Sequence, residues 1–205
     1  MSDCPIPRLV VVLDRPGCLL PVAEVVSRAV AGGADVIQVR EKTLPQIEVR
    51  ALAELVIRAA GDPVRVSVNS FPQLAGELRT NAHLPERFEP GREPIALAPG
   101  RLLSRSVHVR RPMDGLPTAD YLILGNIFET TSKSGMPGIG VDTLRTLCAS
   151  TTTPVLAIGG IEPDRVESVM GAGAHGVAVR SWIIGSSDPE AATREMRKEI
   201  DRWTM

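Results

Sequence analysis

The chain has 205 residues, of which 43% are hydrophobic and 23% are charged, and its formal net charge is −1. A length of this order can bury a substantial core within one domain, which we expect to comprise residues 1–205. The near-neutral balance argues against a nucleic-acid-binding surface or a polybasic membrane patch, but it is compatible with a local cationic pocket. The apolar runs are too short to span a bilayer and the N-terminal MSDCPIPR has no apolar signal core, so we expect a cytoplasmic protein.

The cysteines give no sign of a metal or redox motif. Cys4, Cys18 and Cys148 have neither CxxC nor CxxH spacing. An odd, scattered set in a cytosolic chain is most simply interpreted as free thiols.

Short apolar, β-branched runs recur along the whole chain and predict eight strands. Several are apolar on both faces, as expected of parallel strands that are covered by helices. The predicted strands span residues 8–14, 35–41, 64–69, 82–85, 102–108, 121–127, 154–160 and 176–183, and the fourth is the weakest.

Helical patterns lie between these strands. Residues 44–61 place Leu52, Leu55, Val56 and Ala59 on one face, with a proline near the start and Gly61 just past the end. Further helices are predicted at residues 141–150, 162–173 and 188–203, and the last two begin with an acidic residue followed by proline, which suits an N-cap and a first helical position.

Alternating strands and helices indicate right-handed βαβ units, and eight of them in a chain of this length indicate a single-domain (β/α)8 TIM barrel. The connections after the fourth and fifth strands are rich in proline and glycine, so we expect their helices to be shortened or lost. A flavodoxin-like open sheet is the alternative, because it needs only five or six strands.

Polar residues gather where these strands end, which is the face that carries the active site in such barrels. In VIQVREK the side chains of Gln38, Arg40 and Lys42 share one face of the second strand. The other predicted site residues at strand ends are Asn69, Ser106, His108, Gly159, Gly160, Arg180 and Ser181.

A phosphate site is predicted after the seventh and eighth strands. In AIGGIEPDR two glycines precede a helix, so backbone N–H groups and the helix dipole can bind a phosphate together with the N–H groups of VRSW. The polar loop at 128–140, FETTSKSGMPGIG, suits a flexible cover over an anionic ligand, with Thr130 and Lys133 as its contacts. A plain β-to-α turn and a solvated loop are the respective structural alternatives.

His108 is the predicted acid/base, because imidazole titrates near neutral pH and this residue ends the fifth strand. The role of His83 stays open, and His175 should face the opposite end of the barrel. No pair of carboxylates or His/Asp cluster is found among the strand ends, so no metal site is predicted.

Four stretches together resemble the thiamine phosphate synthase/TenI superfamily: VIQVREK, FETTSKSGMPGIGVDTL, PVLAIGGIEPDRV and GAHGVAVRSWI. The resemblance runs from about residue 8 to residue 203 and implies a (β/α)8 barrel. It also implies one of two activities in thiamine biosynthesis. The synthase joins a pyrimidine diphosphate to a thiazole phosphate with Mg²⁺ held by two aspartates, whereas the TenI-type tautomerase aromatises a carboxythiazole phosphate without a metal.

The resemblance favours the tautomerase, because this chain has Ser70 and Phe88 where the synthase has its aspartates. Glu86 or Glu89 are possible substitutes. The tautomerase needs no cofactor, and the resemblance assigns its proton transfer to His108, the ethyl phosphate to Gly159, Gly160 and Ser181, and the anionic substrate to the cations. The alternatives are the synthase, with Mg²⁺, and a non-catalytic phosphate-binding or regulatory relative. The resemblance also suggests a homodimer, and Arg180 departs from the apolar residue usual at its position.

Overall fold

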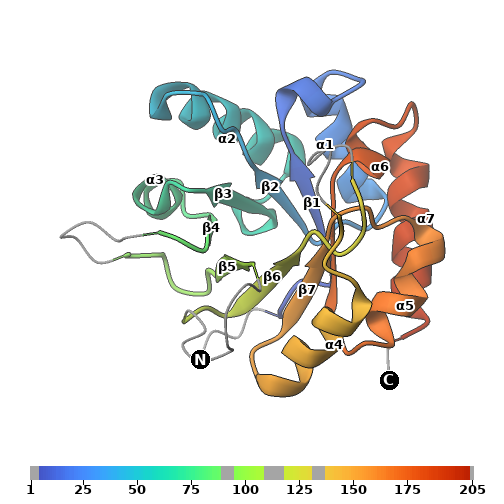
Figure 1. Cartoon of the computed structure of the whole chain (residues 1–205). Helices are drawn as coiled ribbons and strands as arrows, with labels where there is room; N and C mark the ends of the chain where they lie inside the picture. Colours follow the sequence, from blue (N-terminus) through green and yellow to red (C-terminus); the bar gives the residue numbers. More distant parts are fainter. Residues whose placement is uncertain (1–4, 89–94, 109–117, 131–136, 204–205) are drawn as a thin grey trace.

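The computed structural model describes residues 5–88, 95–108, 118–130 and 137–203. Its strands form one closed, fully parallel barrel in sequence order, in which β8 pairs with β1 (Figure 1). The strands are β1 (Leu9–Leu13), β2 (Val36–Val39), β3 (Val66–Asn69), β4 (Asn81–Leu84), β5 (Leu103–Val107), β6 (Tyr121–Gly125), β7 (Val155–Ile158) and β8 (Gly176–Val179). Closure confirms the predicted TIM barrel and excludes the open sheet.

Alternation along each strand divides the barrel into an interior and an outer core. One cluster of buried side chains, including Val10, Val12, Tyr121 and Leu156, belongs to the interior. A larger cluster, including Leu9, Val11 and Leu13, lies between the strands and the helices. Both faces of the strands are therefore buried, which explains why the sequence shows apolar runs without a polar face.

The helices are α1 (Val22–Ala31), α2 (Gln46–Ala60), α3 (Pro72–Glu77), α4 (Val141–Ser150), α5 (Val166–Met170), α6 (Ser181–Ile184) and α7 (Pro189–Asp201), with short 3-10 turns η1 (Arg15–Gly17), η2 (Pro63–Arg65) and η4 (Pro163–Arg165). Helices α2, α4 and α7 occupy predicted segments, the segment 162–173 contains η4 and the short α5, and α1, α3 and α6 were not predicted. Asp188 caps α7 by accepting a hydrogen bond from the Ala191 N–H at 3.1 Å, as its sequence predicts. Glu162 lies at the N-terminus of η4 but makes no such side-chain bond.

The prediction that the eighth strand continues to residue 183 is wrong. The strand ends at Val179, and the next residues form α6, in which the Ile184 N–H donates to the Arg180 carbonyl at 3.0 Å. Ile183 and Ile184 are neighbours and both are fully buried, as neighbouring residues of the strands in this barrel also are. A β-branched apolar run cannot by itself distinguish these two conformations.

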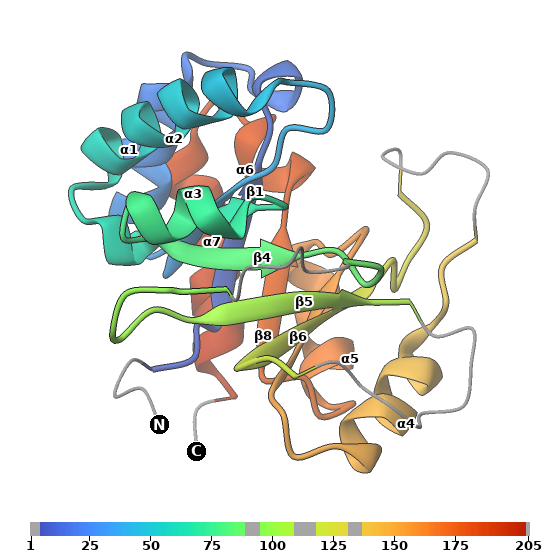
Figure 2. The ribbon, with the colours of Figure 1, turned by 90° about the vertical axis from the view of Figure 1, so that its left-hand side faces the viewer.

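The connections after β4 and β5 agree with the expected loss of helices. Residues 85–88 and 95–102, and likewise 108 and 118–120, contain no helix. Figure 2 shows β4 and β5 at the front of the molecule with α3 beside β4 and no helix drawn in front of β5. Among the described residues, the segments between β4 and β6 therefore add no helix to the outside of the barrel.

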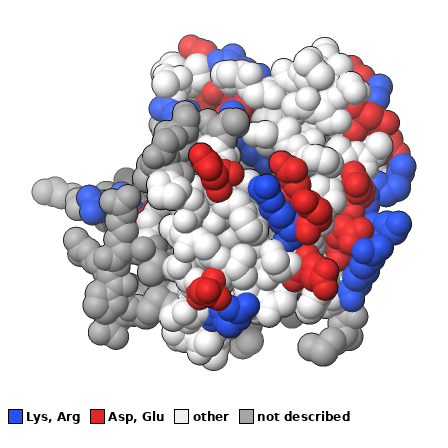
Figure 3. Space-filling model, turned by 45° about the vertical axis from the view of Figure 1, so that its right-hand side comes forward, with Lys and Arg blue, Asp and Glu red and all other residues white. Residues whose placement is uncertain are grey.

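The remaining predictions concern the surface and the thiols. The Nε2 of His175 donates to the Ile6 carbonyl oxygen at 3.3 Å, beside the N-terminal ends of the strands, as expected. Cys18 and Cys148 are free thiols, whereas Cys4 lies outside the described residues. On the face shown in Figure 3 the described acidic and basic side chains interleave. None of the described helices is both long and apolar enough to cross a membrane.

Candidate active site

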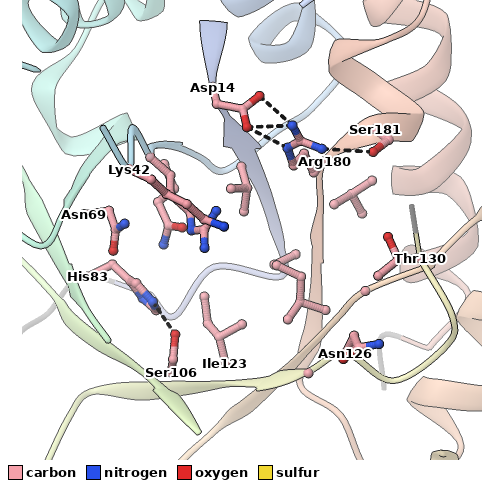
Figure 4. A pocket seen from close by; sticks show the side chains of 18 of the residues that line it. Asp14, Lys42, Asn69, His83, Ser106, Ile123, Asn126, Thr130, Arg180 and Ser181 are labelled. Carbon is pink, nitrogen blue, oxygen red and sulfur yellow. Dashed lines mark hydrogen bonds and ion pairs between the residues drawn. The ribbon is translucent and has the colours of Figure 1, made fainter. Parts of the chain in front are cut away.

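The C-terminal ends of the strands surround a cavity of about 780 Å³, a size suited to a small organic ligand. All but one of the predicted site residues line this cavity: Gln38, Arg40, Lys42, Asn69, Ser106, His108, Thr130, Gly159, Gly160, Arg180 and Ser181. Lys133 lies outside the described residues. In Figure 4, Lys42, Asn69, His83 and Ser106 lie on one side of the pocket, and Thr130, Asn126 and Ser181 lie on the other. The parallel strands bring together residues that are far apart in the sequence.

Arg40 and Lys42 leave positive charge at the end of β2 that the described protein does not balance. Neither side chain forms an ion pair or a side-chain hydrogen bond with any described residue. The intervening Glu41 points elsewhere, because its carboxylate accepts from the Arg15 N–H at 2.8 Å. Burial lowers the pKa of the Arg40 guanidinium from its ordinary value, Asp14 acts in the opposite direction, and Arg180 lowers it further. A half-buried, unpaired cation favours the binding of an anionic ligand.

Arg180 is already paired, with a residue that the sequence reasoning missed. Its guanidinium donates to both carboxylate oxygens of Asp14, at 2.6 to 3.0 Å, across the junction of β8 and β1 (Figure 4). Asp14 also accepts from the Gly17 N–H at 3.1 Å, so the ion pair fixes the turn that follows β1. Asp14 directly follows a strand, and the same kind of position was the reason for selecting Arg180 from the sequence.

The glycine turn after β7 takes a shape that other residues resist. Gly159 and Gly160 have φ values of +102° and +64°. A Cβ on Gly160 would lie 2.5 Å from the Glu129 carbonyl oxygen, so both conformation and space require glycine. Within the described chain no acceptor is found for the N–H groups of Gly160 or Ser181. These residues flank the cavity from β7 and β8, the arrangement predicted for a phosphate site.

Strands β2 to β5 form a wall of the cavity that carries polar side chains down to its buried end. The side chains of Gln38, Ser67, His83 and Ser104 are all buried. Among the described groups, the Gln38 Nε2 and the Ser67 Oγ have no hydrogen-bond partner, and these two residues are paired across β2 and β3. Unpartnered buried donors are costly, so a ligand atom or a water molecule that satisfies the Gln38 amide is expected in the cavity. Gln38 was predicted, whereas Ser67 was not.

His108 lies at the rim of the cavity. Its side chain is 46% exposed, and its Nδ1 is 3.5 Å from Glu86 Oε2. Its backbone N–H donates to Glu86 Oε1 at 2.8 Å, so Glu86 holds both the chain and the ring at this point. Glu86, one of the two possible substitutes for a metal-binding aspartate, is therefore engaged with His108, and the other, Glu89, lies outside the described residues. The half-exposed imidazole ring can therefore reach a ligand from the rim of the cavity.

The described residues do not fit a Mg²⁺ site built on two aspartates. Ser70 lies where the resemblance places one aspartate, and Phe88 where it places the other. Ser70 has a φ of +68° and its N–H donates to the His83 carbonyl at 2.8 Å. In the described part of the chain no three His, Cys, Asp or Glu side chains gather as metal ligands would. A hydroxyl group is a weaker substitute for a carboxylate toward this cation.

The strands form a closed parallel barrel, and unpaired cations and a glycine turn lie at their C-terminal ends. These features are typical of the class of (β/α)8 barrels that bind small anionic ligands. A family model described as "Thiamine monophosphate synthase" matches residues 9–183. The chain belongs to this family.

Individual relatives agree with the family match. The thiamine-phosphate synthase of Moorella thermoacetica is 39% identical over 207 residues, covering 94% of this chain and 95% of the relative. That of Pyrococcus furiosus is 31% identical and covers 95% of both chains. The solved structure of thiamine phosphate pyrophosphorylase from Pyrococcus furiosus has 28% identity, a TM-score of 0.76 and 97% coverage of both chains. A 3-hexulose-6-phosphate synthase structure, at 17% identity and a TM-score of 0.67, shares the fold alone.

These similarities support an enzyme of thiamine biosynthesis. They favour the synthase over the tautomerase, which the sequence prediction had placed first. The curated relatives are named synthases, which was the alternative prediction, and not tautomerases. The resemblance motifs could not separate the two, because both groups carry them. The decision had rested on two positions, Ser70 and Phe88, whereas the identity extends over nearly the whole chain.

Proposed function

We propose that the chain is a thiamine-phosphate synthase, a transferase that joins a pyrimidine diphosphate to a thiazole phosphate. The observation that carries this proposal is the 39% identity to a named synthase over 94% of the chain. The site supports it with unpaired cations beside a cavity large enough for two small heterocycles. Both substrates are anionic, so a cavity with Arg40 and Lys42 on one wall and a glycine turn on another suits them.

Different residues of the chain bind the two anionic groups, the diphosphate of one substrate and the phosphate of the other. In the coupling step the thiazole nitrogen forms a bond to the pyrimidine-bearing carbon while the bond from that carbon to the diphosphate oxygen breaks, and the electron pair leaves with the diphosphate. Arg40 and Lys42 stabilise the negative charge that develops on this leaving group. The N–H groups of Gly160 and Ser181 hold the thiazole phosphate. This division is supported by the positions of the cations after β2 and of the turns after β7 and β8.

The proposal predicts that the purified protein forms thiamine phosphate from the two substrates. Arg40→Ala should lower kcat/KM by about a hundredfold or more, because a charge-assisted contact to the leaving group is lost. Arg145→Ala is the matched control, since Arg145 lies on the outer helix α4 and is 56% exposed. Liquid chromatography of the product measures both rates. Equal losses in the two variants would contradict the role given to Arg40.

A thiazole tautomerase is the second candidate, and one observation favours it. Ser70 and Phe88 stand at the positions of the two aspartates that the synthase uses for Mg²⁺. The tautomerase shifts one proton between a ring carbon and an exocyclic carbon, and a single positioned acid/base suffices for that. We assign this role to His108, which lines the cavity and whose ring is held by Glu86.

The second candidate predicts aromatisation of the carboxythiazole phosphate in the presence of a chelator. His108→Asn should lower this rate by about a hundredfold or more, because general acid/base catalysis contributes on that scale. Ultraviolet absorbance follows the aromatic product. An unchanged rate in His108→Asn would show that another group moves the proton, and coupling activity without aromatisation would leave the synthase alone.

A further inference from the structure

A buried histidine lies between two serines in the polar wall of the cavity. The Nδ1 of His83 is 2.8 Å from the Oγ of Ser104, and its Nε2 is 2.8 Å from the Oγ of Ser106. Ser106 lines the cavity, whereas Ser104 is fully buried below it. Figure 4 shows His83 and Ser106 pointing toward each other from β4 and β5. The three side chains therefore form one hydrogen-bonded row that ends at the ligand space.

The direction of each hydrogen bond in this row follows from a backbone carbonyl. Ser104 Oγ lies 3.3 Å from the Ala82 carbonyl oxygen and 2.8 Å from His83 Nδ1; the carbonyl can only accept the single hydroxyl proton, whereas the imidazole nitrogen can also donate. With the hydroxyl proton directed to the carbonyl, Ser104 Oγ accepts from His83, and the imidazole proton lies on Nδ1. In a neutral ring the other nitrogen is an acceptor, so Ser106 donates its proton to Nε2.

The surroundings of His83 keep the ring neutral. Its side chain is 4% exposed, and the charged groups that act on it are Arg40 from β2 and Arg105 from β5, both cationic. No described carboxylate forms an ion pair with it. Burial, with the two arginines, lowers the pKa of His83 from 6.5 to about 3. Protonation would place a second buried cation beside Arg40.

We propose that His83 is a positioning residue that fixes the hydroxyl of Ser106, so that Ser106 presents only acceptor lone pairs to the cavity. Ser106 then selects an N–H or O–H group on the substrate ring and does not donate to a phosphate. This refines the expected role of Ser106, which was grouped with the phosphate contacts. The ligand part rests on the proposed function, because it takes the occupant of the cavity to be a heteroaromatic ring, whereas the tautomer is a property of the free protein.

Long-range ¹H–¹⁵N spectra of the imidazole groups in the free protein test the tautomer. The chain has three histidines, so His83→Gln assigns the resonances of His83. The expected result is a protonated Nδ1 and an unprotonated Nε2 that do not change between pH 5 and pH 8. In Ser104→Ala the Nδ1 proton loses its acceptor, and the share of the Nε2–H tautomer should rise. A protonated Nε2 in the wild-type protein overturns the proposal, whether or not the variant folds.

Binding of two small probes tests the ligand part separately. 4-Aminopyrimidine carries a donor that 4-methylpyrimidine lacks, and chemical-shift titration measures the affinity of each. The wild-type protein should bind the amine about tenfold more tightly, and Ser106→Ala should abolish that preference. If the wild-type protein shows no preference, or binds neither probe, the assignment of a ligand donor is wrong. The coupling assay is independent of this outcome, so failure of the proposed function can be distinguished from failure of this inference.

Discussion

At the scale of single residues, the informative groups are those that the chain leaves unsatisfied. Arg40 and the exposed Lys42 have no described anionic partner, and the Gln38 amide nitrogen is buried without an acceptor. Stable cores rarely keep groups such as the Gln38 amide and the half-buried Arg40 guanidinium unpaired, because each costs free energy that folding does not recover. Their concentration at one end of one barrel is a property of the site and not of the fold. The alternating sequence VIQVREK predicted a shared face for these three side chains. All three line the cavity, but β2 ends at Val39, so Arg40 and Lys42 do so from the segment that follows the strand.

Gly160 gives a first prediction. Gly160→Ala forces a residue with a Cβ into φ +64° and against the Glu129 carbonyl oxygen, so it should lower the free energy of unfolding by about 2–4 kcal/mol. Gly61→Ala is the control, because Gly61 has φ +79° with open space around its Cβ position and should cost only about 1 kcal/mol. Urea denaturation measures both. Similar losses would mean that conformation alone, without the contact, sets the cost.

The buried His83 gives a pH prediction. Its pKa is lowered from 6.5 to about 3 in the folded protein, so between these values the unfolded chain binds the extra proton. The contribution to stability is therefore complete above pH 6.5 and decreases as the pH falls toward 3. From pH 6.5 to 4.5 the wild-type protein should lose about 2 kcal/mol more than His83→Gln, as measured by denaturation at each pH. Parallel pH profiles would show that His83 is not buried in its neutral form.

At the scale of elements, the ends of β8 and β1 are joined by one ion pair. Asp14 and Arg180 are mostly buried, with side-chain exposures of 18% and 27%, and the pair also fixes the turn at Gly17. Glu41 holds the other side of the same turn through the Arg15 N–H. The segment after β1 is thus attached to both of its neighbours and forms a rigid part of the cavity rim.

A double-mutant cycle tests this attachment. Asp14→Asn and Arg180→Gln should each destabilise the protein, and the coupling between them should be about 1 kcal/mol, since the pair is still partly solvated. Thermal or urea unfolding of the four proteins gives the value. Strictly additive losses would show that the two side chains stabilise the fold independently.

The elements differ in how well the sequence predicts them. Helix α4 occupies the predicted residues 141–150, because a periodic apolar face and a following strand signal define both ends. The end of β8 was missed, because VRSWII has strand composition, although its last four residues form a helical turn with Ile183 and Ile184 in the core. Asp14 was missed although it directly follows a strand, and its pairing with Arg180 could not be predicted, because 166 residues separate the two and a single sequence does not reveal such pairs.

At the scale of the whole molecule, the barrel followed from counting strands. Eight apolar runs with helices between most of them leave few alternative folds. The barrel closes where β8 pairs with β1. The location of the site followed as well, since parallel strands carry all of their C-terminal ends to one rim. The reaction did not, because synthase and tautomerase share this rim and differ in a few side chains. The extent of a single domain over residues 1–205 and a homodimer remain predictions.

The measurement that tests the central claim most directly is turnover of one purified preparation with two substrate sets. One sample receives the pyrimidine diphosphate and the thiazole phosphate, with Mg²⁺ or with a chelator, and the other receives the unconjugated tautomer of the carboxythiazole phosphate. The proposed synthase predicts stoichiometric thiamine phosphate and pyrophosphate in the first sample, at a rate well above that of aromatisation in the second. Absence of thiamine phosphate under both metal conditions would contradict the account.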